Sequence, residues 1–100
     1  MTPVLTLVSA VIAADRRDEV TRGYRQAIAA GLPDGIRETF LLVHDDGTLA
    51  IATVWEDEGK LEAMRSSGEE PLARRLLREA GGDPELRVFG VAAMSSRESL

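Results

Sequence analysis

The sequence predicts one α+β domain whose elements follow the order strand, helix, strand, strand, helix, strand. Three observations predict it. Four stretches are rich in β-branched and apolar residues, as strands are. An apolar stripe with helical spacing lies between the first and second stretches, and another lies between the third and fourth. The segment "HDDGT" joins the second and third stretches as a tight turn. The length of 100 residues is usual for a single domain with a modest core.

The first expected strand covers residues 4–13 and is apolar on both faces, which is typical of a central strand. A helix follows, and Asp15 is the expected N-cap because its carboxylate can accept from the first free backbone N–H groups. Glycine and proline within residues 31–35 end this helix. Its apolar stripe consists of Val20, Tyr24, Ala27 and Ile28.

Residues 36–44 and 48–55 form the clearest unit of the chain, a β-hairpin. Asp45 and Asp46 suit the central positions of a type I turn, and Gly47 supplies the positive φ of the bulge that follows. A further bulge would shift the register by one residue. Without one, the ladder counted from His44 opposite Thr48 pairs Phe40 with Ala52, Leu41 with Ile51, and Arg37 with Trp55.

The second helix is expected in two pieces, because "SSGEEP" interrupts it. Leu61 and Met64 are the buried side of the first piece, and Ser67 with Glu70 forms a capping box for the second. A last strand covers residues 86–93. The element order is that of the ferredoxin-like fold, an antiparallel four-stranded sheet with both helices on one face. We expect this domain to span residues 1–94, with a polar tail at 95–100.

Both faces of the predicted hairpin are largely apolar, although the helices cover only one face of the sheet. The uncovered face predicts a homodimer, in which two sheets pack against each other. The alternative is that the polar residues of this face suffice to solvate it.

Charge and composition narrow the classes of partner. The formal net charge is −5 and no basic stripe is present, so nucleic acid is not an expected partner. The chain has no cysteine. The apolar N-terminal run reads as a strand rather than a signal sequence and is too short to span a bilayer, so a cytoplasmic protein without membrane contact is expected.

The junction "TVWEDEGKLEAM", in which a tryptophan ends the third strand before an acidic helix start, resembles the antibiotic biosynthesis monooxygenase domain. The similarity in element order covers residues 1–94. It implies a dimeric α/β barrel with a pocket between sheet and helices in each subunit. The family includes oxygenases that oxidise aromatic polyketide quinols without metal or flavin, haem-degrading enzymes, and members without assigned activity.

The resemblance implies a substrate pocket lined by Trp55, Tyr24, Met64 and Arg37. Trp55 could stack on a flat aromatic substrate, or it could simply close the end of the core with its N–H bound to one acceptor. Tyr24 could hold a phenolate or quinol oxygen, or it could pack inward. Arg37 could stack on Trp55 or bind an anion, or it could be a solvated arginine at a strand start.

No catalytic residue is assigned from the sequence. The lone histidine, His44, has the chemistry of a general base, but it abuts the turn and the ladder places it on the face opposite Trp55. Neither the acidic turn nor the acidic helix start suggests a metal site without histidine nearby.

Two branches of the family can be compared at single positions. Ser9, Met64 and Arg74 stand where the haem-degrading enzymes have an asparagine, a tryptophan and a histidine ligand. Ile51 stands where the polyketide oxygenases have a polar residue, four positions before Trp55. We therefore expect no bound cofactor.

The first hypothesis is a cofactor-independent monooxygenase acting on a small aromatic or quinol-type substrate. The alternative is a non-catalytic dimeric module that binds a small molecule or simply assembles. An isomerase or lactonising relative would need a paired acid and base, which the sequence does not offer.

Overall fold

The computed structural model describes residues 2–95 and 97. It confirms the predicted element order and the ferredoxin-like α+β fold. Most of the tail predicted at residues 95–100 lies outside the described residues. The elements are β1 (Val4–Val11), a short 3₁₀ turn η1 (Ala14–Arg16), α1 (Arg17–Ala29), β2 (Ile36–Val43), β3 (Thr48–Trp55), α2 (Glu58–Ser66), α3 (Leu72–Glu79) and β4 (Glu85–Gly90).

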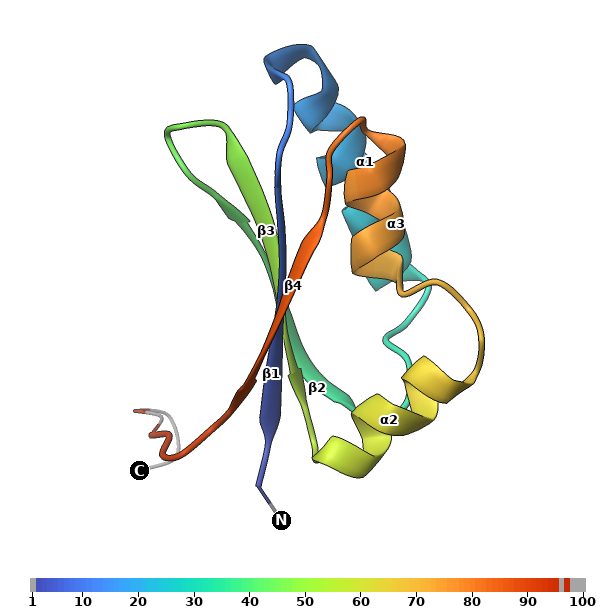
Figure 1. Cartoon of the computed structure of the whole chain (residues 1–100), viewed down its shortest axis with the longest axis vertical. Coiled ribbons are helices and arrows are strands. Elements are labelled where there is room, and N and C mark those ends of the chain that lie inside the picture. Colours follow the sequence, from blue (N-terminus) through green and yellow to red (C-terminus); the bar gives the residue numbers. More distant parts are fainter. Residues whose placement is uncertain (1, 96, 98–100) are drawn as a thin grey trace.

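The four strands form one antiparallel sheet in the order β2-β3-β1-β4. Strands β3 and β1 are therefore central, and β2 and β4 are the edges. All three helices lie on the same side of the sheet, with α1 and α3 packed together toward one end and α2 near the other (Figure 1). We call the uncovered side of the sheet the open face.

The core lies between the sheet and the helices and falls into two clusters. The larger joins β1 and β3 to α1 and α3, and its fully buried members include Ile12, Val20 and Leu77. The smaller gathers Trp55 and Leu61 with the start of β1, below α2. The helix-side positions of β1 alternate as Val4, Thr6, Val8 and Ala10, all buried. This alternation is the period of a strand with one well-covered face.

The hairpin turn follows the prediction made from its sequence. Gly47 has φ of 96° and its N–H donates to the His44 carbonyl at 3.1 Å, while His44 N–H donates to the Thr48 carbonyl at 2.9 Å. A glycine is required there because other residues rarely adopt this backbone conformation.

The register predicted for Arg37 is wrong. A β-bulge between Ile36 and Glu38 places Ile36, and not Arg37, opposite Trp55, although Phe40–Ala52 and Leu41–Ile51 pair as expected. The bulge allows the Ile36 side chain to pack into the smaller cluster and leaves Arg37 exposed. Burial of an apolar side chain lowers the free energy of the folded state, whereas burial of a guanidinium would cost its hydration.

Two predicted helix caps are also wrong. Asp15 lies within η1, and α1 begins after Arg16 without a side-chain cap. Ser67 ends α2 instead of opening α3, since its hydroxyl donates to the Met64 carbonyl at 2.7 Å. The cap of α2 is Asp57, whose carboxylate accepts from Lys60 N–H at 2.9 Å.

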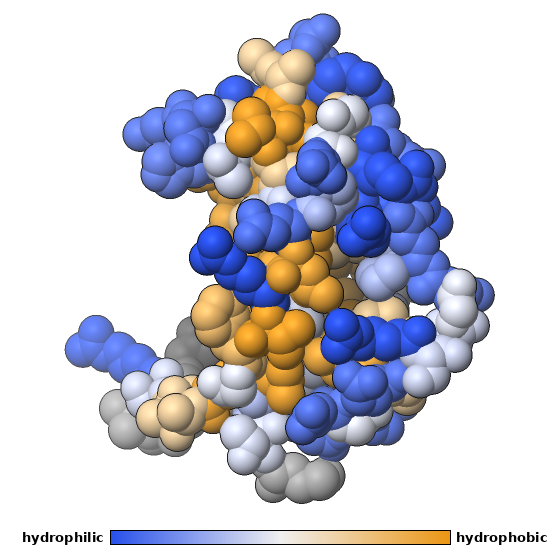
Figure 2. Space-filling model, viewed as in Figure 1, coloured by the Kyte–Doolittle hydropathy of each residue, from blue (hydrophilic) through white to orange (hydrophobic). Residues whose placement is uncertain are grey.

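The open face carries exposed apolar side chains on its edge strands. Phe40, Leu42 and Phe89 project from the two edge strands on this side and are each 46–47% exposed. In Figure 2, apolar surface runs along the strands, and hydrophilic surface covers the helical side. Exposed apolar area of this extent is typical of a surface that another protein covers.

Candidate functional site

A cavity of about 450 Å³ lies between the sheet and the helices. Its floor is the helix side of the sheet, and its walls come from α1, α2, α3 and the segments that precede β2 and α3. This volume falls within the range of small-molecule sites. The cavity reaches the edge strand β4, where Leu86 and Val88 line it and remain 44% and 46% exposed. Solvent can therefore enter along this edge.

Trp55, Tyr24 and Met64 all line this cavity, from β3, α1 and α2 respectively. The Trp55 side chain is only 4% exposed, and its Nε1–H donates to Thr6 Oγ1 at 3.1 Å. The ring thus closes the end of the core and also borders the cavity. Both alternatives stated for Trp55 from the sequence are compatible with this position.

A row of hydroxyl groups crosses the cavity floor. The register places Thr39 opposite Thr53 and Thr53 opposite Thr6, so one threonine from each of β2, β3 and β1 stands side by side. Thr39 Oγ1 lies 3.4 Å from Thr53 Oγ1, and Tyr24 OH donates to Thr39 Oγ1 at 3.3 Å. All four residues line the cavity. We call Thr6, Thr53, Thr39 and Tyr24 the hydroxyl row.

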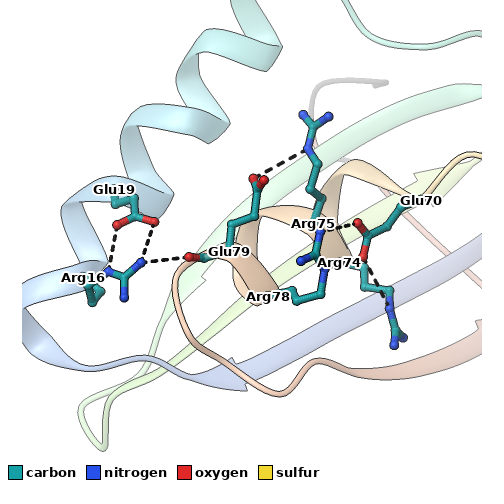
Figure 3. A network of polar contacts seen from close by, with 7 residues as sticks. All are labelled: Arg16, Glu19, Glu70, Arg74, Arg75, Arg78 and Glu79. Atoms are coloured by element: carbon teal, nitrogen blue, oxygen red, sulfur yellow. Dashed lines mark hydrogen bonds and ion pairs between the residues drawn. The ribbon is translucent and has the colours of Figure 1, made fainter.

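Ion pairs hold the outer wall that α3 forms (Figure 3). Arg78 donates twice to the Glu70 carboxylate, at 2.7 and 2.8 Å, which fastens the segment before α3 to its last turn. This hydrogen bonding lowers the pKa of Glu70 below its ordinary value. Arg16 donates to the Glu79 carbonyl at 2.8 Å and so ties the start of α1 to the end of α3. The wall is thus fixed at both ends by surface contacts.

Arg37 does not join the other residues predicted for the pocket. It is exposed at the bulge, and the cavity is lined by Ile36 at that position. His44 is also remote: its side chain is 73% exposed and lies against Asp46 in the turn. Neither residue lines the cavity.

Not all of the positions compared with known family branches line the cavity. Met64 and Arg74 line the cavity, whereas Ser9 pairs with Ala50 on the open face and does not line it. Ile51 is buried at 3% exposure and lines the cavity floor. An apolar side chain therefore occupies the place at which the polyketide oxygenases carry a polar one.

Within residues 2–95 and 97, no group of three or more histidine, cysteine or acidic side chains is placed to hold a metal ion. No helix in the same part of the chain combines the length and the apolar composition needed to cross a membrane.

No protein-family model matches the sequence, and no curated protein sequence matches it. Solved structures, in contrast, match along nearly the whole chain. A putative antibiotic biosynthesis monooxygenase from Deinococcus radiodurans superposes with a TM-score of 0.68 at 14% identity, covering 93% of this chain and 96% of the other.

Two further matches carry other descriptions. SnoaB, a cofactor-independent oxygenase from Streptomyces nogalater, gives a TM-score of 0.66 at 17% identity, over 97% of this chain and 98% of its own. A heme-degrading protein from Mycobacterium tuberculosis gives 0.67 at 21% identity, over 95% and 97% of the two chains. The structure thus confirms, at the level of the fold, the resemblance drawn from the sequence: this chain has the fold of the antibiotic biosynthesis monooxygenases.

Proposed function

We propose that this chain is a cofactor-independent monooxygenase that oxidises a small aromatic or quinol-type substrate in the cavity between sheet and helices. The observation that carries the proposal is the cavity itself, which is mostly apolar, opens at one sheet edge and meets Trp55, Tyr24 and Met64. The similarity in fold to a cofactor-independent oxygenase supports it. A cytoplasmic location belongs to the same proposal.

The chemistry needs little from the protein beyond a dry and shaped site. An electron-rich substrate, once it has lost a ring-methylene proton, reduces O₂ directly. One oxygen atom replaces the two hydrogens of the methylene to give a ketone, and the other oxygen leaves with them as water. The enzyme contributes desolvation and orientation of the substrate anion beside oxygen.

Three of the four predicted pocket residues, Trp55, Tyr24 and Met64, have a role in this proposal that their positions permit. Trp55 and Met64 supply apolar contact at the α2 end, and Tyr24 supplies a hydroxyl from α1. Ile36 takes the place expected for Arg37, because the bulge turns Arg37 to solvent. No side chain of the cavity is assigned as the catalytic base.

Oxygen consumption tests this function. Chelator-treated protein is screened in an oxygen electrode against anthrones and hydroquinones, and product is compared with the oxygen used. We expect equimolar oxygen and anthrone consumption that added catalase does not change, because the second oxygen atom leaves as water. No consumption above the uncatalysed rate with any compound would reject the oxygenase function.

A matched pair of variants assigns the activity to the cavity. Ala27→Phe places a ring in the cavity from α1, whereas Ala29→Phe makes the same change at an exposed position of that helix outside the cavity lining. We expect Ala27→Phe to lose activity and Ala29→Phe to keep it. Equal activity in both variants would place the reaction elsewhere.

A second candidate function is a non-catalytic module that binds a small aromatic molecule. Ile51 favours it, because this buried side chain gives the cavity floor no polar group where the polyketide oxygenases have one. The oxygen-electrode screen separates the two functions: a module of this kind binds the same compounds, is blocked by Ala27→Phe, and consumes no oxygen.

We also propose that the chain forms a homodimer through the open face. The support is the exposed apolar group of Phe40, Leu42 and Phe89, which no helix or strand of the described residues covers. A stable dimer of this type would bury on the order of 2,000 Å².

A further inference from the structure

We propose that the hydroxyl row binds the carbonyl oxygen of a flat and otherwise apolar ligand, with Thr6 and Thr53 as the donors. This inference rests on the proposed function, because it names the chemistry that the cavity recognises in its ligand. It also provides a place for the negative charge that forms on such an oxygen when the ring loses a proton.

The sheet register brings the hydroxyls together. Neighbouring strands place directly opposed side chains with Cβ atoms about 4.5–5.5 Å apart. Thr53 is directly opposed to Thr39 on one side and to Thr6 on the other. One ligand oxygen above Thr6 and Thr53 can therefore accept from both, in the manner of two donors that share an oxyanion.

Counting the hydroxyl protons shows that two of them have no acceptor within residues 2–95 and 97. Thr6 Oγ1 accepts from Trp55 Nε1, and no hydrogen bond of the described residues uses the Thr6 proton. Thr39 and Thr53 share one bond, so only one of their two protons is engaged, and Tyr24 gives its own proton to Thr39. The proton of Thr6 is therefore free, and when Thr39 donates to Thr53 the proton of Thr53 is free as well.

Burial makes these protons selective. Thr6 and Thr53 are 7% and 6% exposed, and both line the cavity. A buried donor that a ligand covers without accepting from it loses its hydration and gains nothing in return. A hydrocarbon would therefore be disfavoured, and a ligand with an acceptor oxygen at this point would be preferred.

The charges around the cavity favour a carbonyl over a carboxylate. Three arginines line it, and each already has a carboxylate partner: Arg65 lies 3.2 Å from Glu62, Arg74 lies 3.8 Å from Glu70, and Arg75 lies 3.9 Å from Glu79. The floor itself carries hydroxyls and no cation. Hydroxyl donors suit a neutral ketone or quinone oxygen, and they stabilise an enolate as its charge develops.

A pair of ligands that differ in one oxygen tests the inference. 1-Tetralone and tetralin have the same bicyclic skeleton, with and without a ketone. Binding is followed by the indole N–H resonance of Trp55, the only tryptophan, which reports directly on the bond to Thr6. The measured quantity is the ratio of the dissociation constant of tetralin to that of tetralone.

We expect Thr53→Val and Thr6→Val each to lower this ratio about five- to tenfold, which corresponds to one hydrogen bond. Thr53→Ser and Thr6→Ser keep the hydroxyl and should keep the ratio. Thr21→Val makes the same chemical change on α1, outside this cavity, and should also leave the ratio unchanged.

The outcomes separate this inference from the proposed function. If both ligands shift the Trp55 resonance and the ratio is the same in wild type and both valine variants, the hydroxyl row does not bind the oxygen, and the cavity remains an aromatic site. If neither ligand shifts the resonance, the cavity does not accept bicyclic aromatic ligands, and both the inference and the proposed function fail. The wild-type and serine proteins give a result even where a valine variant does not fold.

Discussion

Replacing Phe40 by serine should weaken the proposed homodimer strongly, because this side chain lies on the open face, on edge strand β2. Phe40 is 46% exposed, which is about 90 Å² of a side chain with a surface of about 200 Å². At about 25 cal/mol per Å², covering this area contributes about 2 kcal/mol. A twofold dimer contains two copies, so the dissociation free energy should fall by about 4 kcal/mol, which is about a thousandfold in the dissociation constant.

Sedimentation equilibrium over a wide concentration range measures this change. Wild-type protein should approach twice the chain mass of 10.8 kDa at micromolar concentration, and Phe40→Ser should remain close to the monomer mass. Circular dichroism establishes that the variant is folded.

Val43→Ser provides the matched control. Val43 lies on the same strand and is 68% exposed, but it points to the helix side of the sheet. It should therefore leave the association unchanged. A wild-type mass of one chain at every concentration would refute the open-face argument, as would a Phe40→Ser protein that associates as tightly as wild type.

Three further predictions concern stability. Trp55→Ala should lower the free energy of unfolding in urea by about 3–5 kcal/mol, since the ring is 4% exposed, whereas Trp55→Phe should lower it much less. The hydrogen bond from Arg78 lowers the pKa of Glu70 in the folded state. The stabilisation from this pair is therefore present at neutral pH and is lost as the pH falls below the ordinary value of 4.5 and through the lowered pKa. The melting temperatures of wild type and Glu70→Gln should accordingly differ at pH 7 and converge in acid. Gly82→Ala should lower the free energy of unfolding by about 1–3 kcal/mol, because the added Cβ would lie 2.8 Å from the Cβ of buried Ala10. Gly90→Ala is the control and should change the stability little, because open space surrounds it. Equal melting temperatures of the two variants would contradict the packing argument.

The elements of the fold could be predicted from the sequence because their signals are local. Apolar period, β-branched composition and helix-breaking glycines lie within each segment. The turn at Gly47 follows directly from the sequence, since the backbone conformation it needs is one that glycine adopts readily. The caps failed for the opposite reason. Ser67 can serve the end of α2 or the start of α3, and the sequence contains both possibilities.

At the bulge before Glu38, packing overrides the regular ladder that is counted from the turn. Strict alternation would direct Ile36 to the open face and Arg37 into the core. One extra residue in the strand exchanges them, so that Ile36 joins Trp55 in the smaller cluster. The sequence shows that residue 36 is apolar and residue 37 is charged. Burial of the isoleucine and hydration of the arginine stabilise the strand more than a regular ladder would, so the bulge forms.

The hydroxyl row needed more than a local signal. The hairpin ladder already places Thr39 opposite Thr53, and this pairing follows from the turn. Thr6 precedes its partner Thr53 by 47 residues in the chain, and the register of β1 against β3 is decided by the fold as a whole. Three separate threonines in the sequence thus become one polar line only in the assembled sheet.

The two faces of the sheet differ in the kind of polar residue they carry, and the difference fits two kinds of contact. The cavity face has uncharged hydroxyls in its middle, on Thr6 and Thr53, which are buried and line the cavity. The open face keeps its charges on the edge strands, at Glu38, Glu85 and Arg87, around an apolar centre. A charged rim around an apolar centre is typical of a protein interface. Since adjacent side chains of a strand point to opposite faces, each contact can form without disturbing the other.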